Sequence, residues 1–174
     1  MKERYVVDTN VLIAASAADP ITPADIDATP REPAYREQVW NWLSEFKGCD
    51  SKLILDNQGG IFKEYNRKLG FNDFGPQVVM NKWDKGNINQ VDVTYDDDEH
   101  GELDEPLKTV IHDRADRKMV AASLEAKRIH GQSCVAFAGD TDWHEWEDFL
   151  NQINFELEPV SEEWSRNKYR EKQG

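Results

Sequence analysis

Two acidic residues follow apolar segments of the sequence at points where strands are expected to end. Asp8 comes directly after the apolar residues 5–7, and Asp140 follows the apolar segment 134–138 with one glycine between them. A carboxylate at the end of a buried strand loses its water contacts, so it needs a charged or hydrogen-bonding partner. Because ligands of open parallel sheets bind beyond the carboxyl ends of the strands, both residues are candidates for a functional site.

Four further acids could join them. Asp116 lies in the first turn of a helix predicted over 115–129, and Asp113 stands just ahead of it. Helix capping and the helix dipole offer a structural explanation for this pair. Asp142 follows Asp140 by two residues and could approach the same site. Glu64 lies in the middle of another predicted helix, where a surface position would by itself explain it.

The acids are more informative as a set than singly. Carboxylates that converge on one edge of a sheet repel one another and raise each other's pKa unless a cation neutralises them. Hard oxygen ligands with few His or Cys residues nearby select Mg²⁺ or Mn²⁺ over Zn²⁺. Such a metal site activates water and binds a phosphodiester. The sequence therefore predicts a metal-dependent nuclease whose catalytic and metal-binding acids are Asp8, Glu64, Asp116 and Asp140, with Asp142 as a further ligand.

The surrounding pattern alternates strands with helices, which predicts an α/β fold with three α/β/α layers and a central, mostly parallel sheet. We expect a single domain over residues 1–160, a proline-rich loop over 19–33 and an exposed C-terminal helix or tail over 161–174. Strands are expected at 5–7, 52–55, 134–138 and 155–157, helices at 34–47, 60–69, 76–83, 115–129 and 143–151, and a strand or loop at 107–111.

Composition limits the class of protein. The chain has 174 residues, 39% of them apolar, and no segment approaches the roughly 18 consecutive apolar residues of a membrane span. Its two cysteines, Cys49 and Cys134, are expected to be reduced thiols of a cytoplasmic protein. These features argue against membrane, secreted and metal–thiolate proteins.

The net charge of −13 is mostly local. Residues 91–106 hold eight acids and no Lys or Arg, and without them 26 acids would face 21 basic residues, a net charge of −5. We expect this run to belong to an acidic insertion near 84–106, a surface loop that weakens RNA access by repulsion or recruits a basic partner. It lacks the glycine and glutamate spacing of an EF-hand calcium loop.

The segment YVVDTNVLIAA (5–15) resembles the opening of PIN-domain ribonucleases, whose first strand ends in a metal-binding Asp followed by Thr or Ser and Asn. Similar later elements contain Glu64 in IFKEY, Asp116 in ADRKMVAAS and Asp140 in AFAGDTDW. The resemblance spans residues 5 to about 150. It implies a PIN-like fold, Mg²⁺ or Mn²⁺ as cofactor, and hydrolysis of RNA to products with 5′-phosphate and 3′-hydroxyl ends.

The resemblance also implies an assisting role for Asp142. Thr9 and Asn10 would orient the first carboxylate or a water, although an ordinary polar turn explains them equally well, and Asp113 is a further auxiliary candidate. Two features depart from the family pattern. Ala138 stands where relatives often carry Ser or Thr, and the loops make the chain longer than the compact VapC-like toxins of toxin–antitoxin pairs. The toxin assignment therefore follows less directly than the PIN fold.

RNA is the expected substrate, and basic residues lie close to the predicted acids. Lys63, Arg67 and Lys68 surround Glu64, while Arg114, Arg117 and Lys118 surround Asp116, so all six are candidate phosphate contacts. An antitoxin or another protein partner, and a homodimer, stay open at this stage.

Two alternatives stay open as well. A phosphatase of the haloacid dehalogenase type also begins with a strand ending in Asp, but it needs a second Asp two residues later, where this chain has Asn10. A catalytically degenerate PIN module would bind RNA or a protein partner without cutting. The presence of all four acids argues against that second alternative.

Overall fold

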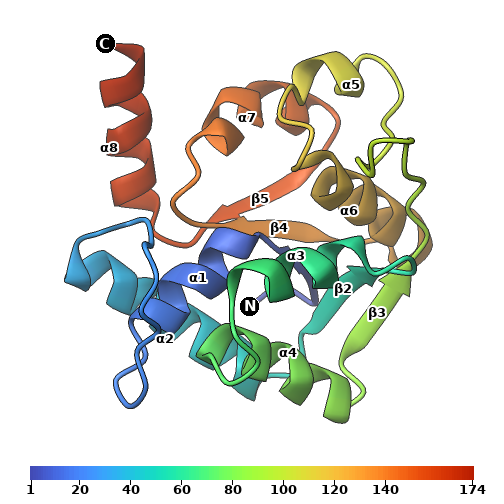
Figure 1. Cartoon of the computed structure of the whole chain (residues 1–174). Helices are drawn as coiled ribbons and strands as arrows, with labels where there is room; N and C mark the ends of the chain where they lie inside the picture. Colours follow the sequence, from blue (N-terminus) through green and yellow to red (C-terminus); the bar gives the residue numbers. More distant parts are fainter.

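The computed structural model describes all residues 1–174 as five parallel strands enclosed by helices (Figure 1). The strand order is β3-β2-β1-β4-β5, and every neighbouring pair is parallel. The strands are β1 (Arg4–Val7), β2 (Lys52–Asp56), β3 (Ile88–Val91), β4 (Cys134–Phe137) and β5 (Glu156–Pro159). The α/β fold class with a central parallel sheet is therefore confirmed.

Helices cover both faces of the sheet. In Figure 1, α2 and α4 lie on one side of the strands and α6 and α7 on the other, while α3 contacts α1, β2 and α6. The helices are α1 (Thr9–Ala17), α2 (Pro33–Gly48), α3 (Gly60–Lys68), α4 (Phe74–Asp84), α5 (Leu107–Val110), α6 (Arg117–His130), α7 (Asp142–Gln152) and α8 (Glu162–Gln173). No helix is both long and apolar enough to span a bilayer.

The central strand β1 and its neighbour β4 are buried on both faces, as the apolar segments 5–7 and 134–137 predict. Residues 5–7 of β1 and all four residues of β4 are at most 1% exposed. Behind β4, the ring of Trp143 lies 6.0 Å from Phe137 and 5.3 Å from Trp146, centroid to centroid. This packing fixes the carboxyl ends of β1 and β4, where Asp8 and Asp140 follow.

Two expected elements are wrong. Residues 88–91 form the edge strand β3, although they were assigned to an acidic insertion near 84–106. The sequence INQV lacks the apolar–polar alternation that predicts a strand, because its two apolar residues stand three positions apart and only Val91 is buried. Residues 107–110 form the short helix α5, where a strand or loop was expected.

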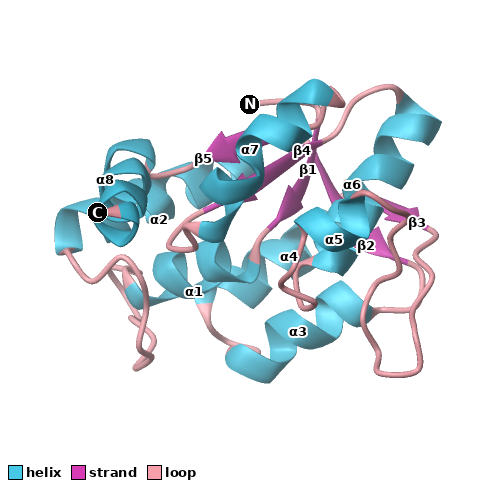
Figure 2. Cartoon of the chain, turned by 90° about the horizontal axis from the view of Figure 1, so that it is seen from above, coloured by secondary structure: helices cyan, strands magenta, loops and turns pink.

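The loop that follows β3 runs past α6 to reach α5 (Figure 2). The C-terminal segment forms α8, of which Trp164 and Ser165 are buried while most other side chains are exposed or half-buried. The indole Nε1 of Trp164 donates a hydrogen bond to Glu32 at 2.9 Å, and Arg166 forms ion pairs with Glu147 of α7. Helix α8 is thus anchored to the domain by its inner side.

Candidate active site

Asp8 ends β1 and immediately precedes α1. Its side chain is 2% exposed, it makes no capping hydrogen bond to α1, and its Oδ2 has no hydrogen-bond partner. Burial raises the pKa of Asp8 well above its ordinary value, and the charges of Asp140 and Glu64 raise it further. A buried carboxylate with an unpartnered oxygen is costly unless something else binds it.

Asp116 immediately precedes α6 and repeats this pattern. It is 7% exposed, its Oδ2 has no hydrogen-bond partner, and it makes no capping hydrogen bond. Burial raises the pKa of Asp116 to about 9, with added contributions from the charges of Asp8, Asp140, Asp113 and Glu64. The local turn is instead closed by Asp113, whose Oδ1 accepts a hydrogen bond from the backbone N–H of Ala115 at 2.9 Å. Capping therefore does not explain Asp116.

Asp140 follows β4 and lies just before α7. Its Oδ1 accepts a hydrogen bond from the backbone N–H of Asp142 at 2.9 Å, and burial raises its pKa, followed by the charges of Asp142 and Asp113. Asp142 itself accepts a hydrogen bond from Lys172 Nζ of α8 at 2.6 Å. Lys172 is a residue that the sequence did not single out, because no local pattern links it to a segment 30 positions away.

Glu64 points from α3 toward α1 and α6. Its carboxylate accepts a hydrogen bond from the Thr9 hydroxyl and forms an ion pair with Lys118 of α6. Lys118 is only 9% exposed and also donates to the carbonyl oxygen of Ala115 at 2.8 Å. Asn10 is half-buried one position further along α1, and its side chain makes no hydrogen bond.

The structure thus gathers the four predicted acids in one region, where each of Asp8 and Asp116 feels the charge of Asp140 and Glu64. No three Asp, Glu, His or Cys side chains have the spacing of an assembled metal site. The fit to Mg²⁺ or Mn²⁺ rests on two other observations. The donors are all carboxylate oxygens, and two buried oxygens, Asp8 Oδ2 and Asp116 Oδ2, have no protein partner.

The predicted basic residues divide into three groups. Lys63 and Arg67 line a pocket beside Glu64. Lys118 lines the same pocket but is held by Glu64, and Arg117 donates to the carbonyl oxygens of Ile111 and Lys108 at 2.9 and 2.8 Å. Arg117 therefore has a structural role. The last two residues, Lys68 and Arg114, are exposed and lie outside the pocket lining.

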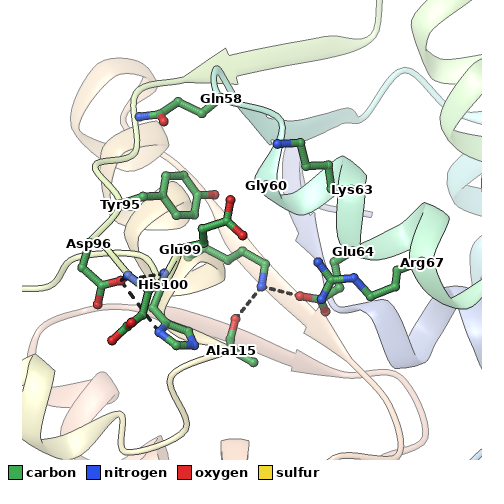
Figure 3. Close-up of a pocket in the computed structure, with 12 residues that line it drawn as sticks. Gln58, Gly60, Lys63, Glu64, Arg67, Tyr95, Asp96, Glu99, His100 and Ala115 are labelled. Carbon is green, nitrogen blue, oxygen red and sulfur yellow. Dashed lines mark hydrogen bonds and ion pairs between the residues drawn. The ribbon is translucent and has the colours of Figure 1, made fainter.

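The pocket has a volume of about 400 Å³ and lies between α3 and the loop after β3 (Figure 3). The loop contributes Tyr95, Asp96, Asp98, Glu99 and His100, none of which was predicted as a site residue. Five residues of the acidic run, which we expect to form a surface loop, therefore line a pocket beside Glu64, and the effect of the run on RNA access stays a prediction. Its signal in the sequence was only charge, and charge alone does not show which part of the chain a loop will face.

Asp56, at the end of β2, explains how the loop reaches this place. Its two carboxylate oxygens accept hydrogen bonds from the backbone N–H groups of Gly60 and Ile61, at 2.9 and 2.8 Å, which fixes the start of α3. The Tyr95 hydroxyl donates to the same carboxylate at 2.9 Å. One buried aspartate thus positions both walls of the pocket.

No family model matches this chain, and no curated protein or solved structure matches it either.

Proposed function

We propose that the protein is a metal-dependent ribonuclease of the PIN type, which hydrolyses RNA phosphodiesters with Mg²⁺ or Mn²⁺. The observation that carries the proposal is the pair Asp8 and Asp116, two buried carboxylates that each leave one oxygen without a partner. Raised pKa values at such a pair are typical of sites that bind a cation or perform acid–base chemistry. The resemblance of residues 5–15 to PIN ribonucleases supports RNA as the substrate.

In this proposal Asp8, Asp116 and Asp140 hold the metal, and Glu64 completes the ligand set. When bound, the divalent ion supplies an activated water and neutralises charge on the phosphate. Thr9 and Lys118 orient the Glu64 carboxylate, to which both are bonded. Lys63 and Arg67 are free to contact phosphates of the RNA strand, because neither forms an ion pair within the protein.

The resemblance extends the proposal further. It suggests the toxin of a toxin–antitoxin pair, with an antitoxin or other protein partner. The two free cysteines are consistent with the proposal of a cytoplasmic protein, and a homodimer is part of the same proposal. A non-cutting RNA-binding module is the second candidate function. Two observations favour it. Lys118 already neutralises Glu64, and no three acids have the spacing of an assembled metal site.

Cleavage of a single-stranded RNA with Mn²⁺ separates these candidates. We compare wild type with Asp8→Asn and Asp116→Asn, and we use Asp148→Asn, an exposed residue on α7, as a control of the same chemical change. Loss of an outer-shell group at a metal site costs about 10- to 100-fold, so loss of a ligand should cost at least about 100-fold. Mn²⁺ should raise the melting temperature of wild type and the control but not of either site variant.

RNA binding without Mn²⁺-dependent cleavage by wild type would favour the non-cutting module. Equal cleavage by wild type and Asp116→Asn would remove Asp116 from the site.

A further inference from the structure

The pocket beside Glu64 has two walls of opposite character. Lys63, Glu64 and Arg67 project from α3 on one side, and Tyr95, Asp96 and Glu99 belong to the loop on the other (Figure 3). Its volume of about 400 Å³ falls in the range of roughly 300–1,000 Å³ found for small-molecule sites.

Internal contacts neutralise or occupy three of the charged groups that line the pocket. Glu64 and Lys118 form an ion pair. Asp96 Oδ1 accepts hydrogen bonds from the backbone N–H groups of Asp98 and His100, at 3.0 and 2.9 Å. Two cations on α3, Lys63 and Arg67, make no ion pair. Two carboxylates on the loop, Asp98 and Glu99, also make no hydrogen bond or ion pair with their side chains.

The loop over residues 95–101 is fixed to the rest of the domain by several contacts. The Tyr95 hydroxyl is bonded to Asp56, and Tyr95 and Gly101 form an antiparallel bridge that closes the loop. A Cβ at Gly101 would lie 2.6 Å from both the Cα and the backbone N of Lys118, so the loop packs directly on the start of α6. The carboxylate wall therefore has a fixed position relative to Glu64.

We propose that this pocket binds one guanosine of the RNA strand and makes it a determinant of sequence preference. This inference rests on the proposed function, because it takes the strand that enters the acidic site as the ligand. The phosphate would contact Lys63 and Arg67. The Watson–Crick edge of guanine presents two adjacent donors, N1–H and N2–H₂, which match the two oxygens of a free carboxylate such as that of Glu99. Phosphate contacts position a strand, whereas contacts to base edges specify its sequence.

The competing explanation for the same acids is unspecific repulsion of RNA. The two explanations differ in base dependence. Repulsion weakens all RNAs alike, and its effect falls as salt screens the charges. Recognition of a guanine edge weakens binding only when the guanine or the carboxylate is changed, because a good bidentate contact to a base discriminates by about 5- to 150-fold.

The test measures equilibrium binding in EDTA, so that a failure of metal-dependent cleavage does not affect it. The probes are four fluorescein-labelled RNA nonamers, with uridine at every position except the central one, which is G, A, C or U. Binding is measured by fluorescence anisotropy at 50 and 200 mM salt. We compare wild type with Glu99→Gln and with the double variant Asp98→Asn/Glu99→Gln. Asp97→Asn is the matched control, because Asp97 belongs to the same loop and is exposed but does not line the pocket.

Wild type and Asp97→Asn should bind the G probe at least about fivefold more tightly than the U probe, and Asp98→Asn/Glu99→Gln should lose that preference. Lys63→Ala should weaken the binding of all four probes by a similar factor. It should also reduce the slope of log affinity against log salt concentration by about 1, the value expected for the loss of one phosphate contact. Equal affinity of wild type for the four probes would overturn the proposal. So would tighter binding of every probe by both acidic variants, because that result is expected from repulsion. Guanine-dependent binding without Mn²⁺-dependent cleavage would keep this inference and contradict the ribonuclease proposal.

Discussion

Replacing Asp116 with Asn should stabilise the metal-free protein in a pH-dependent way. Asp116 has a folded-state pKa of about 9, against an ordinary value of 3.8. A carboxyl whose pKa is raised by folding holds its proton longer in the folded than in the unfolded state, so its favourable contribution is complete below pH 4 and is lost as the pH rises toward 9. Asn keeps the size and polarity of the protonated acid but does not titrate.

The magnitude follows from the same values. Between pH 5 and pH 8, this one group should lower the free energy of unfolding of wild type by about 1.4 kcal/mol per pH unit relative to Asp116→Asn. By pH 7 the accumulated difference amounts to at most about 4 kcal/mol, because the pH then lies about three units above the ordinary pKa, and it grows further as the pH approaches 9. For a chain of this size, about 1 kcal/mol corresponds to a shift of roughly 2–4 °C in melting temperature.

Urea unfolding at pH 5, 6, 7 and 8 in EDTA measures this difference. Asp148→Asn should follow the wild-type curve, since that side chain is exposed. Adding Mn²⁺ at pH 7, at a concentration a hundred times its dissociation constant, should raise the free energy of unfolding of wild type by about 2.7 kcal/mol. It should leave the free energy of unfolding of Asp116→Asn unchanged. Stability curves of wild type and Asp116→Asn that run parallel across the pH range would refute the reasoning, because they would show that Asp116 ionises in the folded protein as it does in the unfolded chain.

Two further substitutions test contacts between distant segments. Lys172→Met removes the partner of Asp142 and should lower Mn²⁺-dependent cleavage about tenfold, while urea unfolding should change by less than about 1 kcal/mol because the Lys172 side chain is 54% exposed. Gly101→Ala places a Cβ 2.6 Å from the backbone of Lys118 and should destabilise the protein by about 1–3 kcal/mol in the same assay, whereas Gly48→Ala, with no atom within 4 Å, should not. Unchanged cleavage in the first variant, or equal unfolding of the two alanine variants, would contradict these contacts.

The sequence predicts β1 and β4 most directly, because their apolar side chains are buried on both faces of the sheet. Residues 5–7 of β1 and all four residues of β4 are apolar, and Asp8 and Asp140 follow their ends. The edge strand β3 was missed because its sequence, INQV, serves a strand with one open side as well as a loop. Leu107–Val110 was misassigned because four residues are too few to distinguish a helical from an extended period.

The candidate site divides in a similar way. Asp8, Asp116 and Asp140 could be found because their neighbours along the chain define where a strand ends or a helix begins, whereas Glu64, in the middle of α3, was supported by the family resemblance. The loop residues that line the pocket could not, because their positions depend on Asp56, which lies 39 residues from Tyr95, and on the backbone of Lys118. Lys172 is likewise placed only by the packing of α8. Contacts of this kind are properties of the folded chain and leave no local pattern.

The placement of the acids also explains how the fold tolerates them. Asp8 immediately precedes α1, Asp116 precedes α6, and Asp140 lies just before α7, so three carboxylates stand at the positive ends of helix dipoles. Asp140 bonds to a backbone N–H of the helix it precedes, and the backbone N–H groups of Thr9 and Asn10 lower the pKa of Asp8, but neither Asp8 nor Asp116 makes a capping bond. The dipoles therefore reduce the free-energy cost of these carboxylates, and the unpartnered oxygens of Asp8 and Asp116 remain destabilising. Proteins retain such destabilising groups where a ligand compensates for them, which is the trade-off that the Asp116→Asn variant measures.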